Sequence, residues 1–189
     1  MAAISISTKT GDDGTTGLAN GIRVRKDAPI MEVIGTLDEL NSWLGLIAAQ
    51  AGSEFPAQRN YLYDIQDTLF YIGAEVAQSP KTKLQKKSLT ALEKQADQLQ
   101  AAMAEGWHTK FLLPGGTVLG SYLDIARTVS RRLERRVITL QQEQHTSEIV
   151  LQYLNRLSDY LYLLRCFVNT AVEYREQQFE VSDKTVHSK

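Results

Sequence analysis

A chain of 189 residues fits one domain with a proper core, on the usual scale of about 100–200 residues per domain. Its charge is nearly balanced, with 21 Lys and Arg against 22 Asp and Glu, which argues against a general nucleic-acid or membrane-surface binder. The single cysteine excludes an intramolecular disulfide. Because the sequence also carries no recognisable signal peptide or membrane span, we expect a cytoplasmic protein.

The stretch from Thr8 to Gly17 reads TKTGDDGTTG and contains no apolar side chain. Glycines let the backbone take positive φ and approach a ligand closely, and successive N–H groups in such turns form concavities that bind anions. The threonine hydroxyls add donors, and Lys9 adds a charge suited to phosphate. This pattern predicts a loop that binds a phosphate-containing ligand.

The rest of the chain shows apolar residues at helical spacing in successive segments. The expected helices cover 27–52, with Asp27 as N-cap or a capping box at Thr36, and about 57–78, 90–105, 117–142 and 147–176. Segment 81–88 is expected to be a mobile loop, and the helix after it to be peripheral. On the fourth helix the expected inward positions are Val118, Tyr122, Ile125, Val129, Leu133, Val137 and Leu140.

These segments predict an all-α fold, a five-helix bundle in a single domain spanning 1–189. Within it, residues 1–27 form an N-terminal arm and loop, about 28–176 form the bundle, and 177–189 form a frayed tail.

The fourth predicted helix is rich in arginine. Arg127, Arg131, Glu134 and Arg135 stand at i, i+4, i+7 and i+8, so they share a face that the apolar stripe does not use. Arginine suits bidentate recognition of phosphate or carboxylate. A solvated helix face with Arg–Glu pairs explains the same pattern equally well.

Other polar and aromatic positions allow two interpretations each. Asp38 fits an exposed acidic turn or a site, and Asn155 fits a hydrogen bond inside the bundle or a ligand contact. Phe111, before a Pro-Gly-Gly turn, fits the core best. The histidines are unclustered, and the sequence contains neither a P-loop nor a Rossmann fingerprint. The residues alone therefore suggest a polyphosphate ligand held by a helical bundle.

Six motifs occur in order along nearly the whole chain. They are TKTGDxG from Thr8, RxxK from Arg23, GTxDELNS from Gly35, FxLPGGT from Phe111, ARTxxRRxER from Ala126 and YLNRLSD from Tyr153. Together they resemble the PduO-type ATP:cob(I)alamin adenosyltransferases. Residues 80–105 and the tail contribute no motif to this resemblance.

The resemblance implies a homotrimer that binds ATP, with Mg²⁺, and cobalamin at subunit interfaces. It implies transfer of the 5′-deoxyadenosyl group to the cobalt of a reduced corrinoid, with release of triphosphate. Cob(I)alamin is itself the nucleophile, so no protein nucleophile is needed. The partners it implies are a flavin-type reductase or an adenosylcobalamin-dependent enzyme, with no nucleic acid and no membrane.

The resemblance also assigns residues. The implied ATP-binding set is Thr8, Lys9, Thr10, Gly11, Thr16, Gly17, Lys26, Arg131, Arg132, Leu133, Glu134, Arg135 and Asn155, with Glu134 as the candidate Mg²⁺ ligand. The implied catalytic residues are Arg127, Arg131, Asp38 and Phe111. Of these, Arg127, Asp38 and Phe111 also bind cobalamin, with Arg127 pairing with Asp38 across the interface and Phe111 at the lower corrin face.

Two other functions remain open at this point. The same loop and arginines would serve a non-catalytic module that binds or delivers ATP or cobalamin, and a purely structural bundle is the third possibility. The phosphate contacts of Thr15 and Thr16 also remain open.

Overall fold

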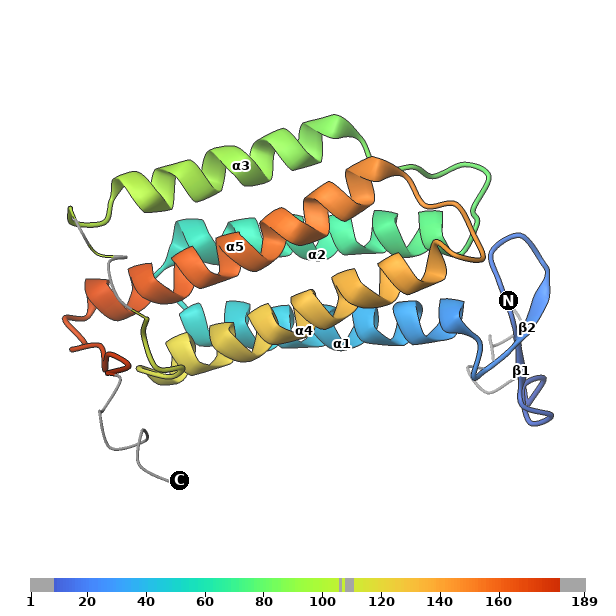
Figure 1. Cartoon of the computed structure of the whole chain (residues 1–189), viewed down its shortest axis with the longest axis horizontal. Helices are drawn as coiled ribbons and strands as arrows, with labels where there is room; N and C mark the ends of the chain where they lie inside the picture. Colours follow the sequence, from blue (N-terminus) through green and yellow to red (C-terminus); the bar gives the residue numbers. More distant parts are fainter. Residues whose placement is uncertain (1–8, 106, 108–110, 181–189) are drawn as a thin grey trace, which may run out of the picture.

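The structure, a computed structural model, describes residues 9–105, 107 and 111–180. Within these ranges the strands β1 (Thr15–Gly17) and β2 (Arg23–Arg25) precede five helices (Figure 1). The helices are α1 (Pro29–Ala51), α2 (Pro56–Val76), α3 (Lys86–Ala101), α4 (Val118–Leu140) and α5 (Glu148–Ala171). The predicted five-helix, all-α fold is therefore confirmed. None of the helices in the described ranges has the length and apolar character needed to cross a membrane.

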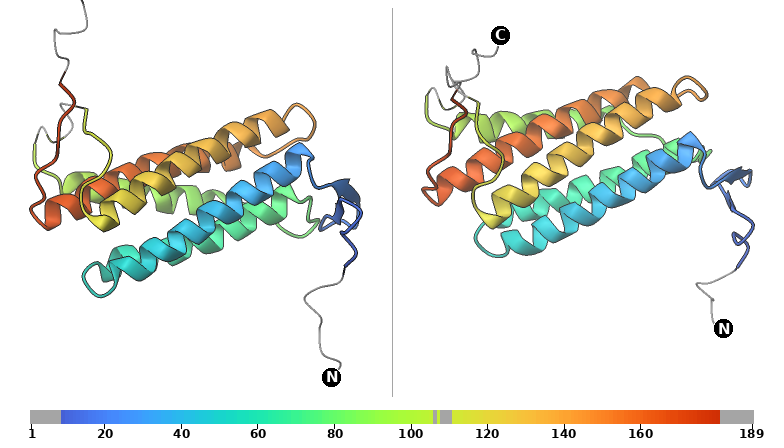
Figure 2. Two further views of the ribbon diagram at one scale, coloured as in Figure 1. Left: turned by 90° about the horizontal axis from the view of Figure 1, so that it is seen from below. Right: turned by 60° about the horizontal axis from the view of Figure 1, so that its bottom comes forward.

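The helices pack as two adjacent pairs with a peripheral fifth. Helix α1 packs against α2 and α4, α4 packs against α5, and α3 packs against α5 (Figure 2). Each contributes the side chains at helical spacing to one continuous core, as expected for amphipathic helices. Only Leu89, Leu92 and Leu99 of α3 are buried, so its predicted peripheral position is confirmed.

Two helix starts differ from the prediction. Helix α1 has Ala28, not Asp27, at its N-cap position, because the Asp27 carboxylate instead pairs with Arg25 at 2.6 Å. Helix α3 begins at Lys86, four residues before the predicted cap at Thr90. The preceding Leu84 is buried and its N–H donates to Glu75 Oε2 at 2.8 Å, which anchors this end of the helix to α2.

The inward face of α4 also differs in part. Val118 and Ile125 were predicted to point inward, but their exposed fractions are 58% and 38%. Leu119, Leu123 and Ala126 are buried instead and continue the line of Leu133 and Val137 into the core. The predicted start of the helix is confirmed, since the Thr117 hydroxyl accepts a hydrogen bond from Gly120 N at 2.9 Å.

Helix α5 ends at Ala171, not at residue 176 as predicted. The chain then turns back, and Gln178 forms an isolated antiparallel bridge with Leu112 before α4. The prediction of a frayed tail is therefore wrong for residues 177–180. Residues 181–189, and residues 1–8 of the predicted N-terminal arm, lie outside the described residues.

The turn before α4 requires glycine at Gly116. Its φ is +116°, and a Cβ there would lie 2.8 Å from Cγ of Asn169 and closer still to its amide nitrogen. Because Asn169 is fully buried and cannot move away, Gly116→Ala should lower the free energy of unfolding by about 2–4 kcal/mol.

Chemical denaturation of Gly116→Ala beside Gly115→Ala measures this effect. Gly115 also has positive φ, at +125°, but a Cβ there would meet nothing within 4 Å. Gly115→Ala therefore introduces backbone strain without the steric clash. Equal losses of unfolding free energy in the two variants would contradict the proposed packing.

Candidate functional site

The described part of the glycine- and threonine-rich loop is ordered by its own hydrogen bonds. The Arg23 guanidinium donates from Nη2 to Thr10 O at 2.6 Å and from Nε to Thr15 Oγ1 at 3.0 Å. Asp13 accepts from the Thr15 hydroxyl at 2.8 Å and from Thr15 N at 2.9 Å, and these bonds hold the pKa of the Asp13 carboxyl below its usual value. The loop is thus shaped before any ligand arrives. Thr8, which was assigned to it, lies outside the described residues.

Lys26 lies across the same loop. Its backbone N–H donates to Gly14 O at 2.9 Å, and its Nζ is only 3.1 Å from the position that a Cβ on Gly11 would take. The missing side chain at Gly11 therefore allows the ammonium group to approach the turn. Lys9 has a positive φ of 56°, which is uncommon for a residue other than glycine. An anion bound to this turn would lie close to the charge of Lys26.

A second group of polar residues lies on the outer side of α4 and α5. Asn155 Nδ2 donates to Glu134 Oε1 at 3.0 Å, so Asn155 is exposed and paired with α4 instead of being buried in the bundle. Arg135 Nη1 donates to the carbonyl of Arg131 at 3.1 Å. In the part of the chain that the structure describes, the exposed Arg131 guanidinium has no ion pair or hydrogen bond. It is therefore available to an anionic ligand.

Arg132 and Leu133, two members of the predicted ATP-binding set, make their side-chain contacts inside the bundle or along its seam. Arg132 forms an ion pair with Glu39 of α1, and Arg136 forms another with Glu32 at 2.9 Å. These pairs line the seam between α1 and α4. The Leu133 side chain is fully buried, so it is not available to a ligand. The binding roles of Arg132 and Leu133 stay predictions.

Phe111 stands at the opposite end of α4 from the loop. Its exposed fraction is 84%, so the interpretation of this ring as a core residue is wrong. Arg127 Nε donates to Asp124 Oδ1 at 3.2 Å, within its own helix. The Asp38 carboxylate is exposed and forms no ion pair with any described residue. A single chain therefore leaves Asp38 available and does not pair it with Arg127.

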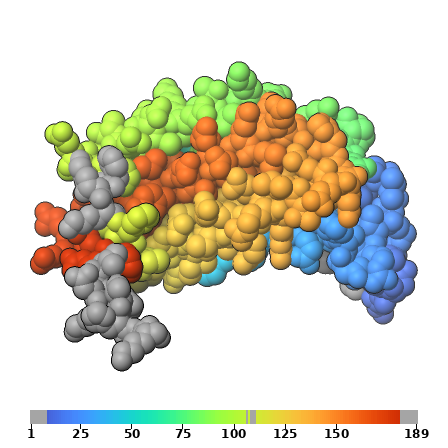
Figure 3. Space-filling model, in the orientation of Figure 1, coloured from blue at the N-terminus to red at the C-terminus, as the bar shows by residue number. Residues whose placement is uncertain are grey.

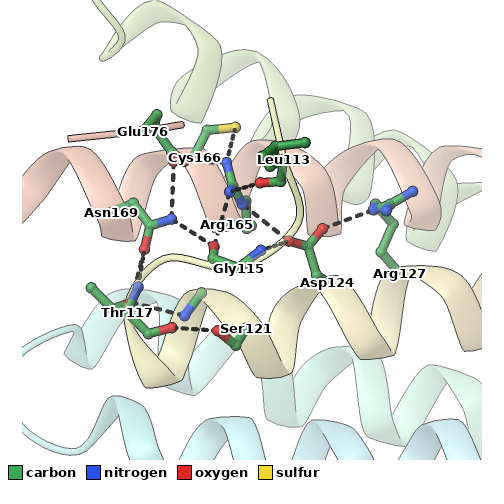
Figure 4. Close-up of polar contacts among 11 residues, drawn as sticks. Leu113, Gly115, Thr117, Ser121, Asp124, Arg127, Arg165, Cys166, Asn169 and Glu176 are labelled. Atoms are coloured by element: carbon green, nitrogen blue, oxygen red, sulfur yellow. Dashed lines mark hydrogen bonds and ion pairs between the residues drawn. The ribbon is translucent and has the colours of Figure 1, made fainter. Parts of the chain in front are cut away.

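Sequence reasoning missed a buried polar cluster beside Phe111, which we call the Arg165 hub (Figure 4). Arg165 is 1% exposed and donates from Nε to Asp124 Oδ2 at 3.2 Å. Its Nη2 donates to the carbonyls of Leu113 at 3.0 Å and Gly115 at 2.9 Å. Its Nη1 donates to Glu176 Oε1 at 2.7 Å. The hub thus joins α4, α5, the Pro-Gly-Gly turn and the segment after α5.

Asn169 completes the hub. It donates to Glu176 Oε1 at 2.9 Å and accepts from Thr117 Oγ1 at 2.8 Å. Burial lowers the pKa of Arg165, but the Cys166 hydrogen bond and the nearby carboxylates more than offset this, so its pKa is raised and the group stays charged. The available sequence signal was the spacing of Arg165 and Asn169, i and i+4, inside an apolar stripe.

The loop and the outer arginine group occupy different places on one chain. The loop and the β1–β2 hairpin project past the C-terminal end of α4 (Figures 1 and 2). There Asn20 Nδ2 donates to Gln78 Oε1 at 2.8 Å. Arg131 lies about two and a half turns before that end of α4. In the space-filling view the front face is formed by α4 and α5, with the loop at one edge (Figure 3). The loop and the Arg131 group therefore lie apart on one chain.

Comparison with known proteins identifies the family. The cobalamin adenosyltransferase family model matches residues 6–168. The corrinoid adenosyltransferase of Bacillus subtilis is 40% identical over 184 residues, which cover 95% of this chain and 94% of that protein. Corrinoid adenosyltransferase PduO of Salmonella typhimurium is 42% identical over 167 residues, which cover 85% of this chain and 48% of that protein.

A solved structure agrees with these relatives. It is a variant of the PduO-type ATP:corrinoid adenosyltransferase from Lactobacillus reuteri, complexed with cobalamin and ATP. It is 31% identical, has a TM-score of 0.88, and covers 94% of this chain and 100% of its own. The loop, α4 and Asn155 of α5 all fall within the range that the family model matches. The resemblance seen in the motifs is thus confirmed, and the chain belongs to the cobalamin adenosyltransferase family.

Proposed function

We propose that this protein transfers the 5′-deoxyadenosyl group of ATP to the cobalt of a reduced corrinoid. The Co(I) centre attacks C5′ of the ribose, a Co–C bond forms, the C5′–O bond breaks, and triphosphate leaves with the electron pair of that bond. The observation that carries the proposal is the family match over residues 6–168. The protein's task is then to orient C5′ over the cobalt and to stabilise the charge on the leaving group.

The nucleotide half of the site combines the loop with the outer face of α4. Lys9, Lys26 and the loop backbone would hold the polyphosphate, and Arg131 would neutralise the charge that grows on triphosphate. The unpaired state of Arg131 within the described residues supports this role. The Asn155–Glu134 hydrogen bond would keep both side chains in place beside the phosphates.

Mg²⁺ accompanies ATP in this proposal and, when bound, supplies further charge neutralisation on the phosphates. The described residues contain no cluster of three or more His, Cys, Asp or Glu that could hold a metal ion. Mg²⁺ usually takes one or two carboxylates and completes its shell with phosphates and waters. Glu134 would hold it through Oε2, since Oε1 accepts the hydrogen bond from Asn155.

The corrinoid half of the site is at the Phe111 end. The exposed Phe111 ring would lie against the lower corrin face, where it offers no ligand atom to the cobalt. A cobalt(II) that lacks its axial base is easier to reduce to Co(I). Asp38 of one protomer would pair with Arg127 of the next, which would replace part of the bond that Arg127 makes to Asp124.

We further propose a homotrimer with the sites at its interfaces. The separation of the loop and the Arg131 group on one chain supports this, as does the exposed apolar surface of Val118, Ile125 and Ile138 on α4. The proposed setting is the cytoplasm. The proposed transient partners are a flavin-type reductase or an adenosylcobalamin-dependent enzyme.

Anaerobic incubation with ATP and chemically reduced cobalamin tests the activity. The expected result is the spectrum of adenosylcobalamin together with an equal amount of triphosphate, over many turnovers. A parallel reaction without reductant should give neither product. Tight binding of ATP without either product would contradict the proposal and favour a binding or delivery module.

A further inference from the structure

The backbone at Phe111 is held by the extended segment that follows α5. Phe179 N donates to Phe111 O at 2.8 Å, and Leu113 N donates to Gln177 O at 2.8 Å. These two bonds flank the bridge between Leu112 and Gln178. In the described part of the chain, the hub adds one hydrogen bond to residues 111–113, from Arg165 to the Leu113 carbonyl. The position of Phe111 therefore depends on the segment after α5.

Glu176 anchors that segment. Its Oε1 accepts charge-assisted hydrogen bonds from Arg165 Nη1 at 2.7 Å and from Asn169 Nδ2 at 2.9 Å, and its side chain is only 18% exposed. Hydrogen bonds of this kind are about twice as strong as neutral ones. The neighbouring carboxylates of the segment, Glu173 and Glu180, are exposed. Of these three carboxylates, Glu176 is therefore the one that ties the segment to α5.

We infer that Glu176 is a positioning residue for Phe111: by holding residues 177–179 against 111–113, it sets where the exposed ring meets the corrinoid. The inference rests on the proposed function, because the corrinoid contact of Phe111 is part of that proposal. An open hollow of about 520 Å³ lies beside the paired strip, lined by Leu113 and by Arg175–Gln178 and Glu180. A released segment would have this space to move into, and the ring would move with it.

Glu176→Ala should therefore impair the handling of the corrinoid and leave the handling of ATP intact. With ATP bound, the fraction of cob(II)alamin in the four-coordinate form should fall, and KM for cobalamin should rise roughly 10-fold or more, since small displacements of a positioning group have effects of this size. KM for ATP should change less than about twofold, because the loop and Arg131 make no contact with Glu176. Glu176→Gln keeps an acceptor for both donors and should restore most of the four-coordinate signal.

Three further variants separate positioning from general destabilisation. Glu173→Ala removes an exposed carboxylate from the same segment and should behave as wild type. Phe179→Pro leaves the hub intact but deletes the N–H that bonds Phe111 O, so it should reproduce the spectroscopic loss. Its control, Phe179→Ala, keeps that N–H and should retain the signal.

Phe111→Ala, measured in parallel, separates this inference from the proposed function. If Phe111→Ala loses the four-coordinate signal while Glu176→Ala and Phe179→Pro keep it, the positioning role of Glu176 is overturned. If Phe111→Ala itself keeps the signal, the ring is not at the cobalt, and the corrinoid half of the proposed site is wrong as well. Loss of the signal in all three variants, with the two alanine controls unaffected, is the expected result.

Discussion

Arg131→Ala should lower kcat by roughly 10²–10³-fold, equivalent to about 3–4 kcal/mol, because one charge that stabilises the leaving triphosphate is lost. The same substitution should change the free energy of unfolding by no more than about 0.5 kcal/mol. The reason is that the Arg131 guanidinium is exposed and makes no ion pair with the described residues. Single-turnover kinetics with ATP and cob(I)alamin, together with thermal unfolding, measure both quantities.

Lys94→Ala is the matched control, since it removes one exposed positive charge from α3, far from the proposed site. Its rate should equal that of the wild type. A rate near wild type in Arg131→Ala would remove Arg131 from the reaction. A rate loss matched by an equal loss of stability would mean that the arginine supports the fold.

Asp38→Asn should raise KM for cobalamin about tenfold or more, because truncation of one partner of a buried interfacial charge pair typically costs about 2–5 kcal/mol. KM for ATP should stay near wild type. The expected effect depends on the pairing of Asp38 with Arg127 of a second protomer, since within one chain the Asp38 carboxylate is exposed and unpaired among the described residues. Steady-state kinetics with each substrate varied in turn measure the two constants.

A double-mutant cycle tests the pair itself. If Asp38 and Arg127 act together, adding Arg127→Gln to Asp38→Asn should increase KM for cobalamin little beyond the larger single effect. Asp97→Asn, an exposed carboxylate on α3, supplies the control for a loss of surface charge. Fully additive effects, or an unchanged KM in Asp38→Asn, would argue against the cross-subunit pair.

Much of the fold could be predicted from the sequence because the helical spacing of apolar residues determines which side chains form the core. The apolar stripe of α5 and the start of α4 near Thr117 were both predicted correctly. The errors occurred where tertiary contacts override local signals. Helix α3 starts early because Leu84 is held on Glu75, and α5 ends early because the chain is needed for pairing with residues 111–113.

The same distinction applies to the candidate site: residues on one helix could be predicted from their spacing, and contacts between distant segments could not. Regular spacing on one helix predicted that Arg131, Glu134 and Arg135 would share a face, and Asn155 joins them in the structure. The Arg165 hub could not be predicted in this way. Its charged members come from three separate segments, and the turn carbonyls that satisfy Arg165 leave no trace in the sequence.

We propose that each nucleotide is held between the loop of one protomer and α4 of another. Co-assembly of two variants tests it directly: Lys9→Ala/Lys26→Ala, damaged only in the loop, and Arg131→Ala, damaged only on α4. Each should be nearly inactive alone, but equal co-expression should restore about a quarter of the wild-type rate, because independent mixing leaves that share of interfaces with both parts intact. No recovery in oligomers shown to contain both variants would mean that the loop and α4 of the same chain act together, and would contradict the account.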